Sequence, residues 1–145
     1  MKPFLISLAI LVVAVPVAHA ALFSGRTSQD RKVLLETDAD DLPSAIGIRW
    51  HARCADGGRL VQPTNFAPPF DESSRTFVRD GGPYRSTVRD NEGRKYNLRI
   101  RAHIRGRLVD ENTWRGRFRA RARVRRNGEL VTTCRKRGIR WRTTD

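Results

Sequence analysis

Arginine alternates with apolar residues along two neighbouring stretches near the carboxyl end of the chain. The guanidinium group is planar, permanently charged and geometrically matched to phosphate, sulfate and carboxylate. In an extended strand, alternate side chains share one face and lie about 6.6 Å apart. The two stretches therefore predict an anion-binding surface, with the candidate residues Arg99, Arg101, Arg105, Arg107, Arg115, Arg117, Arg119, Arg121, Arg123 and Arg125.

The charge of the chain is concentrated in the same region. The 145 residues include 29 Lys and Arg against 15 Asp and Glu, a formal net charge of +14. Residues 21–84 hold 8 basic and 9 acidic residues (net −1), whereas residues 85–145 hold 20 and 6 (net +14). Such a surface favours anionic polymers as partners: polysaccharide, teichoic acid or the DNA backbone. The alternative is a solvated face that serves solubility and edge protection, enriched in Arg by a GC-rich genome.

The odd or even numbering of the residues on each face, here called parity, constrains how the two stretches pair. The apolar residues of 96–108 and of 114–124 all carry even numbers. Because paired residues share a face, the loop between them must contain an odd number of residues, three or five. In either register Arg opposes Arg, which destabilises a sheet by up to about 1 kcal/mol per pair. The sequence either recruits anions there or tolerates this cost.

Shorter alternating stretches occur along the rest of the chain. They predict strands over 23–28, 33–37, 46–54, 75–79, 84–88 and from 129 to about 141. Turns are expected at 56–58 and 80–83, and the prolines within 62–69 favour an irregular loop or an edge strand. The pattern predicts an all-β fold, an antiparallel meander of about eight strands closed as a small barrel or folded as a sandwich.

The Asn127-Gly128 pair is the strongest hairpin signal in the chain. A two-residue turn there would pair Val124 with Val131 and send Cys134 to the opposite face. A bulge or a longer turn would return Cys134 to the interior, and the sequence leaves these alternatives open.

The amino-terminal segment 1–20 predicts an export signal. Lys2 precedes an apolar run from Phe4 to Val15, and Ala18-His19-Ala20 has the small-x-small form that signal peptidase accepts before Ala21. The run is too short to span about 30 Å of hydrocarbon. We therefore expect a secreted or extracytoplasmic mature chain, residues 21–145, which forms a single β domain.

Two cysteines, Cys54 and Cys134, remain in the expected mature chain. An even number in an exported chain predicts a disulfide, with two buried free thiols as the alternative.

Three short motifs resemble those of small secreted β-rich proteins of unknown function from high-GC, actinobacterial-type bacteria. They are Phe23-Ser24-Gly25-Arg26-Thr27-Ser28-Gln29, Cys54-Ala55-Asp56-Gly57-Gly58, and Cys134 followed by Gly138-Ile139-Arg140-Trp141. The resemblance implies export, a disulfide and β structure, and it carries no activity.

The remaining polar residues do not form a catalytic pattern. His51 and His103 lie on the polar parity of predicted strands, and no serine has a nucleophile-elbow setting. No spacing fits a metal site or a phosphate-cradling loop, and Asp38, Asp40 and Asp41 lack the Gly and distal Glu of a calcium loop. We predict a non-enzymatic protein without cofactor or metal.

Two other functions stay open at this stage. Trp50, Trp114, Phe118 and Trp141 lie on apolar parity, which favours the core; in a roomy barrel some of them could line a small-molecule cavity. A hydrolase is the third reading, and it requires His51 or His103 beside a Ser and an Asp.

Overall fold

The computed structural model describes residues 20–73 and 75–145, and all regular structure among them is strand. The nine strands are β1 (Ala21–Thr27), β2 (Lys32–Thr37), β3 (Pro43–Cys54), β4 (Arg59–Phe66), β5 (Asp71–Ser73), β6 (Thr76–Arg89), β7 (Lys95–Asp110), β8 (Thr113–Arg126) and β9 (Glu129–Thr144). The predicted export signal lies, except for Ala20, outside the described residues, and β1 begins directly after Ala20.

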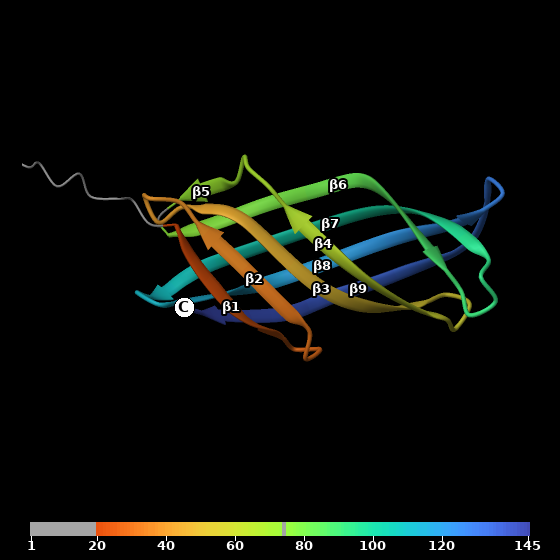
Figure 1. Ribbon diagram of the computed structural model, residues 1–145, viewed down its shortest axis with the longest axis horizontal. Coiled ribbons are helices and arrows are strands. Elements are labelled where there is room, and N and C mark those ends of the chain that lie inside the picture. Colours follow the sequence, from red (N-terminus) through yellow and green to blue (C-terminus); the bar gives the residue numbers. More distant parts are fainter. Residues whose placement is uncertain (1–19, 74) are drawn as a thin grey trace, which may run out of the picture.

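One antiparallel sheet contains all nine strands, in the order β4-β3-β2-β1-β9-β8-β7-β6-β5. The two meanders β1–β4 and β5–β9 are joined because β1 pairs with the end of β9. A second pairing, between the ends of β3 and β9, bends the sheet into a partial ring. Figure 1 shows the long strands β6 to β9 side by side, with β1 to β4 crossing them. The all-β antiparallel prediction is confirmed.

Side-chain contacts connect β4 to β6, where backbone pairing between strands ends. The edge strand β4 faces β6 across a seam in which Tyr84 and Thr64 hydroxyls lie 2.6 Å apart and the Ser86 hydroxyl donates to Gln62. The Arg79 guanidinium donates to the carbonyl of Ala67, 3.0 Å away. Side-chain bonds therefore hold β4 to β6.

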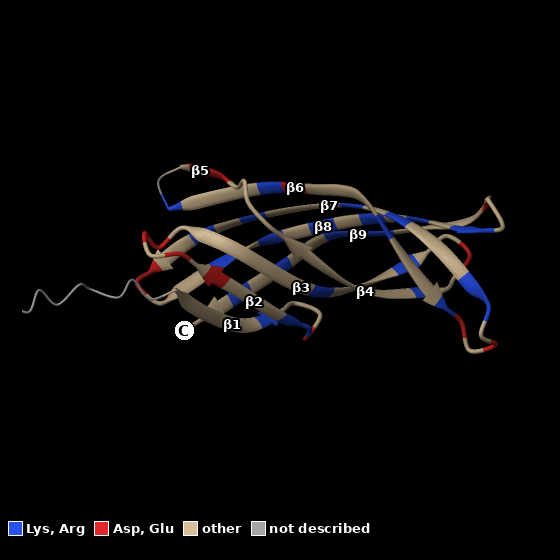
Figure 2. Cartoon of the chain, turned by 45° about the horizontal axis from the view of Figure 1, so that its top comes forward, with Lys and Arg blue, Asp and Glu red and all other residues tan. Residues whose placement is uncertain are grey.

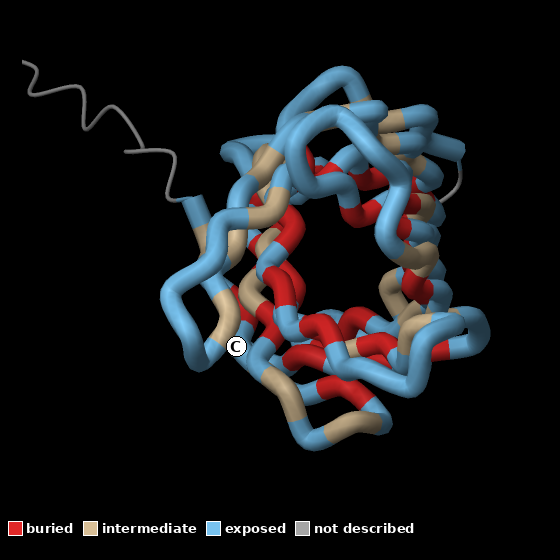
Figure 3. The backbone as a smooth tube through the Cα atoms, turned by 90° about the vertical axis from the view of Figure 1, so that its right-hand side faces the viewer, coloured by how far each residue is buried: buried red, intermediate tan, exposed pale blue. Residues whose placement is uncertain are grey.

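Figure 3 shows buried residues along the inside of the ring. The apolar side chains of these residues form the core. Trp50, which is fully buried, lies 5.9 Å from Phe118 between ring centroids, and its indole N–H donates to the Thr64 hydroxyl. Phe77 packs between Trp114, at 5.7 Å, and Trp141, at 6.1 Å. The four aromatic residues expected in the core are all buried there, at most 3% exposed.

The loop between β7 and β8 has the five-residue register. Leu108 pairs with Trp114, and one extra residue, Val109, bulges out of β7 before the turn. Between β8 and β9 both open alternatives combine: Asn127 and Gly128 form a two-residue turn with positive φ, of 51° and 83°, and Val131 is the extra residue of a bulge. Val124 therefore pairs with Thr132, and Cys134 faces the interior.

The structure differs from the sequence-based prediction at residues 80–83 and resolves the alternatives for 62–69. The turn predicted at 80–83 is wrong, because β6 continues through this segment and the shift between Gly81 and Tyr84 is a bulge in its pairing with β7. A bulge accommodates glycine and proline without reversing the chain. For 62–69 each alternative holds in part: residues 62–66 belong to the edge strand β4, which contains Pro63 and has one ladder neighbour, β3, and residues 67–69 lie in an irregular loop.

The cysteines form a disulfide, Cys54–Cys134, between residues that face each other in the β3–β9 pairing. The bond covalently closes the ring at its second junction. Stable disulfides are typical of proteins that fold outside the reducing cytoplasm.

Reduction of this disulfide should lower the free energy of unfolding by about 4 kcal/mol, because the bond closes a long loop in the unfolded chain. The cysteines are 80 residues apart. Urea denaturation of the oxidised and reduced protein measures the difference. Equal midpoints for the two forms would contradict this stabilising role.

A pair of glycines allows the core and the sheet to approach closely. Gly106 and Gly116 face each other on β7 and β8, beneath the indole of Trp141. A Cβ at Gly106 would lie 2.5 Å from the Phe77 ring and 2.7 Å from the Trp141 ring. Because glycine has no side chain, the rings of Phe77 and Trp141 can pack directly against the sheet at Gly106 and Gly116.

Gly106→Ala should therefore cost about 1–3 kcal/mol of stability through overpacking. A double-mutant cycle with Trp141→Leu, followed by denaturant unfolding, tests the cause. The cost should shrink in the Trp141→Leu background, whereas an unchanged cost would show that the ring contact is not responsible.

Candidate anion-binding surface

The ten arginines predicted as anion-binding all lie on the outer face of β7 and β8, and all are exposed. Their parity is the opposite of that of the core residues Ile104 and Phe118. Figure 2 shows basic residues along the long strands and acidic residues mainly near strand ends. The structure thus brings the predicted set together on one surface.

Cross-strand pairing aligns these arginines into rows and adds residues that the sequence prediction missed. In the first row, the 105 row, Arg105 faces Arg117, which faces Arg140 of β9. In the second, the 107 row, Arg107 faces Arg115, then Arg142 of β9 and Arg26 of β1. Lys32 of β2 continues the 107 row beyond Arg26.

A third row crosses the other end of the sheet. It contains Arg101, Arg121 and Arg135, and the β3–β9 junction extends it to Arg53 and Arg59. Five strands thus contribute one cation each. The arginines of β9 carried a sequence signal, because Arg140 and Arg142 alternate with Ile139 and Trp141, but the bulge at Gly138 interrupts the parity of that strand.

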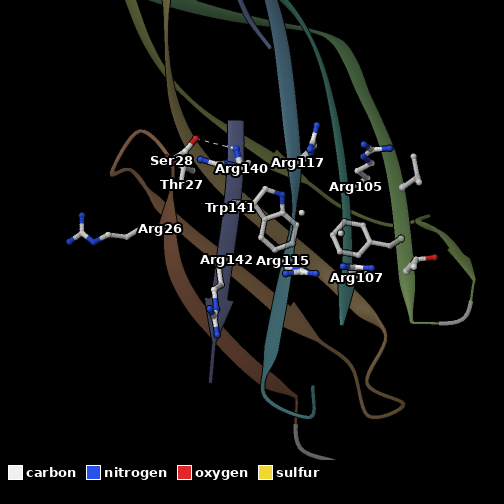
Figure 4. Close-up of a pocket in the computed structure, with 15 residues that line it drawn as sticks. Arg26, Thr27, Ser28, Arg105, Arg107, Arg115, Arg117, Arg140, Trp141 and Arg142 are labelled. Carbon is white, nitrogen blue, oxygen red and sulfur yellow. Dashed lines mark hydrogen bonds between the residues drawn. The ribbon is translucent and has the colours of Figure 1, made fainter. Parts of the chain in front are cut away.

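A hollow of about 840 Å³ lies between the 105 row and the 107 row, and we call it the trough. Figure 4 shows Arg105, Arg117 and Arg140 on one side of it and Arg107, Arg115 and Arg142 on the other, with Trp141 between them. Gly106 and Gly116 also line it. Trp141 is only 2% exposed and Phe77 1%, so their rings are covered, while seven arginines surround the hollow.

A second hollow, of about 150 Å³, is lined by four arginines alone: Arg99, Arg101, Arg121 and Arg123, here called the quartet. Arg99 faces Arg123 and Arg101 faces Arg121 across β7 and β8. Four guanidinium groups around so small a volume make a site of the size of one oxyanion.

Acidic groups in the described part of the chain do not neutralise the ten arginines. The ion pairs found there are Arg26–Asp30, Arg94 with Asp90 and Glu92, and His103–Asp80. Desolvation alone would raise the pKa of Asp90, but hydrogen bonds from Arg94, Tyr96 and backbone amides lower it to about 2. Asp30, Asp90 and Glu92 thus serve turns, whereas Asp80 of β6 pairs with His103. None of the ten arginines forms an ion pair within residues 20–73 and 75–145.

The arginines at the centre of the surface repel one another. The charge of Arg135 is the largest cause that lowers the pKa of the Arg121 guanidinium, followed by desolvation and by the charges of Arg123 and Arg101. A lowered pKa means that the charged form is disfavoured by its surroundings. An external anion would relieve this repulsion.

The two histidines lie on the outer face, at separate places. His103 of β7, between Arg101 and Arg105, has its Nδ1 2.7 Å from an Asp80 carboxylate oxygen. His51 of β3 has its main chain bonded to the Gln29 side-chain amide. Desolvation, then the charges of Arg59, Arg31 and Lys136, lower the pKa of His51. Neither ring is hydrogen-bonded to a serine among the described residues.

Residues 20–73 and 75–145 lack the features of a metal site and of a membrane-spanning helix. This part of the chain has no cluster of three or more His, Cys, Asp or Glu that could hold a metal ion. It also has no helix with the length and apolarity needed to cross a membrane. Asp38 accepts hydrogen bonds from the amides of Asp40 and Leu42, as a turn residue does.

Comparisons of the chain with protein-family models, curated proteins and solved structures found no match. The resemblance to small secreted β-rich proteins of high-GC bacteria therefore stays a prediction.

Arg121→Gln should raise the urea midpoint of unfolding at low ionic strength, because it removes repulsion from two directly opposed arginines, Arg101 and Arg135. The gain should vanish at high salt, which screens exposed charges. Urea unfolding across a salt series measures it. The matched control Arg94→Gln removes the same charge from an ion pair and should lower stability; a loss in both variants would contradict the repulsion.

Proposed function

We propose that this protein is an exported, non-enzymatic β protein that binds anionic polymers through the outer face of β7, β8 and β9. The observation that carries the proposal is the alignment of the ten arginines of β7 and β8, which form no ion pair among the described residues, into cross-strand rows that flank hollows. A sheet that merely needed solubility would gain it from mixed charges, without this concentration of one sign.

The chemistry of the surface supports recognition of charge along a polymer backbone. Guanidinium groups bind oxyanions through paired, charge-assisted hydrogen bonds. Trp114, Phe118 and Trp141 are buried, so they do not offer the stacking platforms that sequence-tolerant binders of single-stranded nucleic acid use. The partner classes that fit are acidic polysaccharide, teichoic acid and the DNA backbone, each read through its charge.

The place of action in this proposal is outside the cytoplasm. The Cys54–Cys134 disulfide supports it, because such bonds persist in oxidising compartments. The finer part of the proposal is secretion through the signal peptide of residues 1–20, with cleavage after Ala20. The envelope polymers named above would then be available to the mature chain.

The two other functions receive less support from the same residues. Trp50 and Trp114, the candidate lining of a ligand cavity, make their contacts with Phe118 and Phe77 inside the core. His103, a candidate catalytic base, lies on the charged outer face bonded to Asp80.

The mature, oxidised protein should bind a polyanion with a dissociation constant that rises about 10³-fold between 50 and 200 mM salt, as expected when roughly six phosphate contacts release counterions. Titration of fluorescently labelled DNA, heparin and teichoic acid across this range measures the slope. A lack of binding at low salt, or binding that is insensitive to salt, would refute polyanion binding.

A further inference from the structure

We infer that the trough binds a single, unbranched phosphate chain that lies across the strands, at right angles to β7, β8 and β9. This inference rests on the proposed function and specifies where the polymer lies and which chemical class it belongs to. The reasons are the direction of the hollow, its width and the chemistry of its walls and floor.

The outward-pointing cations are spaced differently across the strands and along each strand. Neighbouring strands lie about 4.8 Å apart, whereas successive outward residues along one strand lie about 6.6 Å apart. The wider interval separates the 105 row from the 107 row, and the trough occupies this interval. The quartet likewise lies between two successive cross-strand pairs, Arg99–Arg123 and Arg101–Arg121. Space for a ligand chain therefore runs between rows, across the strands.

The two ends of the trough differ in charge. On the β6 side the partners of Arg105 and Arg107 are Val78 and Thr76, which are uncharged. On the other side the 107 row continues to Arg26 and Lys32. A chain that enters over β7 therefore meets cations on β8, β9, β1 and β2 in turn.

The width of the trough admits one polymer chain. The two rows start about 6.6 Å apart at the backbone, and arginines of both rows line the hollow between them. A double helix is far wider than this interval and would contact only the tips of the guanidinium groups. Only a single chain can enter the trough and contact arginines of the 105 row and of the 107 row at the same time.

The walls favour phosphate over carboxylate. A carboxylate has two oxygens in one plane and is matched by one guanidinium fork. A phosphate in a linear chain has oxygens directed to both sides of the chain, so that Arg117 on one wall and Arg115 on the other can each donate to it. The floor is the sheet backbone at Gly106 and Gly116, and the Trp141 ring lies on the inner face beneath it, so bases or sugars would gain no stacking there.

The test compares two variants that remove equal charge from the same two strands. Arg105→Gln/Arg117→Gln removes a cross-strand pair from the trough, and Arg99→Gln/Arg123→Gln removes an equivalent pair from the quartet. Both variants relieve repulsion, and thermal unfolding checks that each is folded. The probe is fluorescently labelled linear inorganic polyphosphate, with polygalacturonate and duplex DNA as comparison polymers.

We expect the trough variant to lose about 50-fold or more in affinity for polyphosphate, as for the loss of two charge-assisted contacts, and the quartet variant about 5-fold or less. Equal losses in the two variants, or tighter binding of polygalacturonate or duplex DNA than of polyphosphate by the unmodified protein, would overturn this inference and leave the proposed function standing. Failure of the unmodified protein to bind any of the three polymers at low salt would overturn both.

Discussion

The structure depends on the register between β7, β8 and β9. A shift of one residue would turn every side chain of a strand to the other face, exchanging guanidinium groups with core residues. Extra residues at Val109 and Val131, and the bulge near Gly138, set this register. The same alignment places Arg over Arg outside and Gly106 beside Gly116 inside, where Trp141 fills the space. The charged surface and the core are thus two results of one pairing.

Such a surface costs stability, and the opposite face of the same strands offsets that cost. Each outward arginine of β8 alternates with a core residue such as Phe118 or Ala122, so burial of apolar area accompanies every exposed charge. The disulfide acts at a critical place: Cys54 and Cys134 are adjacent to Arg53 and Arg135, which face each other between β3 and β9. A covalent bond thus joins the strands where two like charges meet.

Alternation in the sequence was sufficient to predict the β fold, the outward direction of the ten arginines and the buried aromatics. Parity alone restricted the β7–β8 loop to three or five residues, and the structure has five. The turn expected at 80–83 failed because glycine and proline signal bulges as well as reversals. The Arg–Arg pairs between β7 and β8 followed from parity, but the extension of the rows could not be predicted, because the pairing of Arg26 with Arg142 and of Arg53 with Arg135 joins strands distant in sequence. Alternation in the sequence predicts on which face of the sheet a side chain lies. The neighbours of that side chain on other strands depend on long-range strand pairing, which alternation does not reveal.

The seam between β4 and β6 bears on the shape of the whole sheet. A barrel closed by backbone hydrogen bonds has a circumference fixed by its strand number and stagger. Here Tyr84 meets Thr64 and Ser86 meets Gln62 through side chains alone. The distance between β4 and β6 is therefore set by these side-chain contacts and by the bond from Arg79 to the carbonyl of Ala67. Because the curvature of a sheet determines how far its outward side chains diverge, the side-chain contacts of this seam help to set the spacing of the guanidinium groups on the outer face.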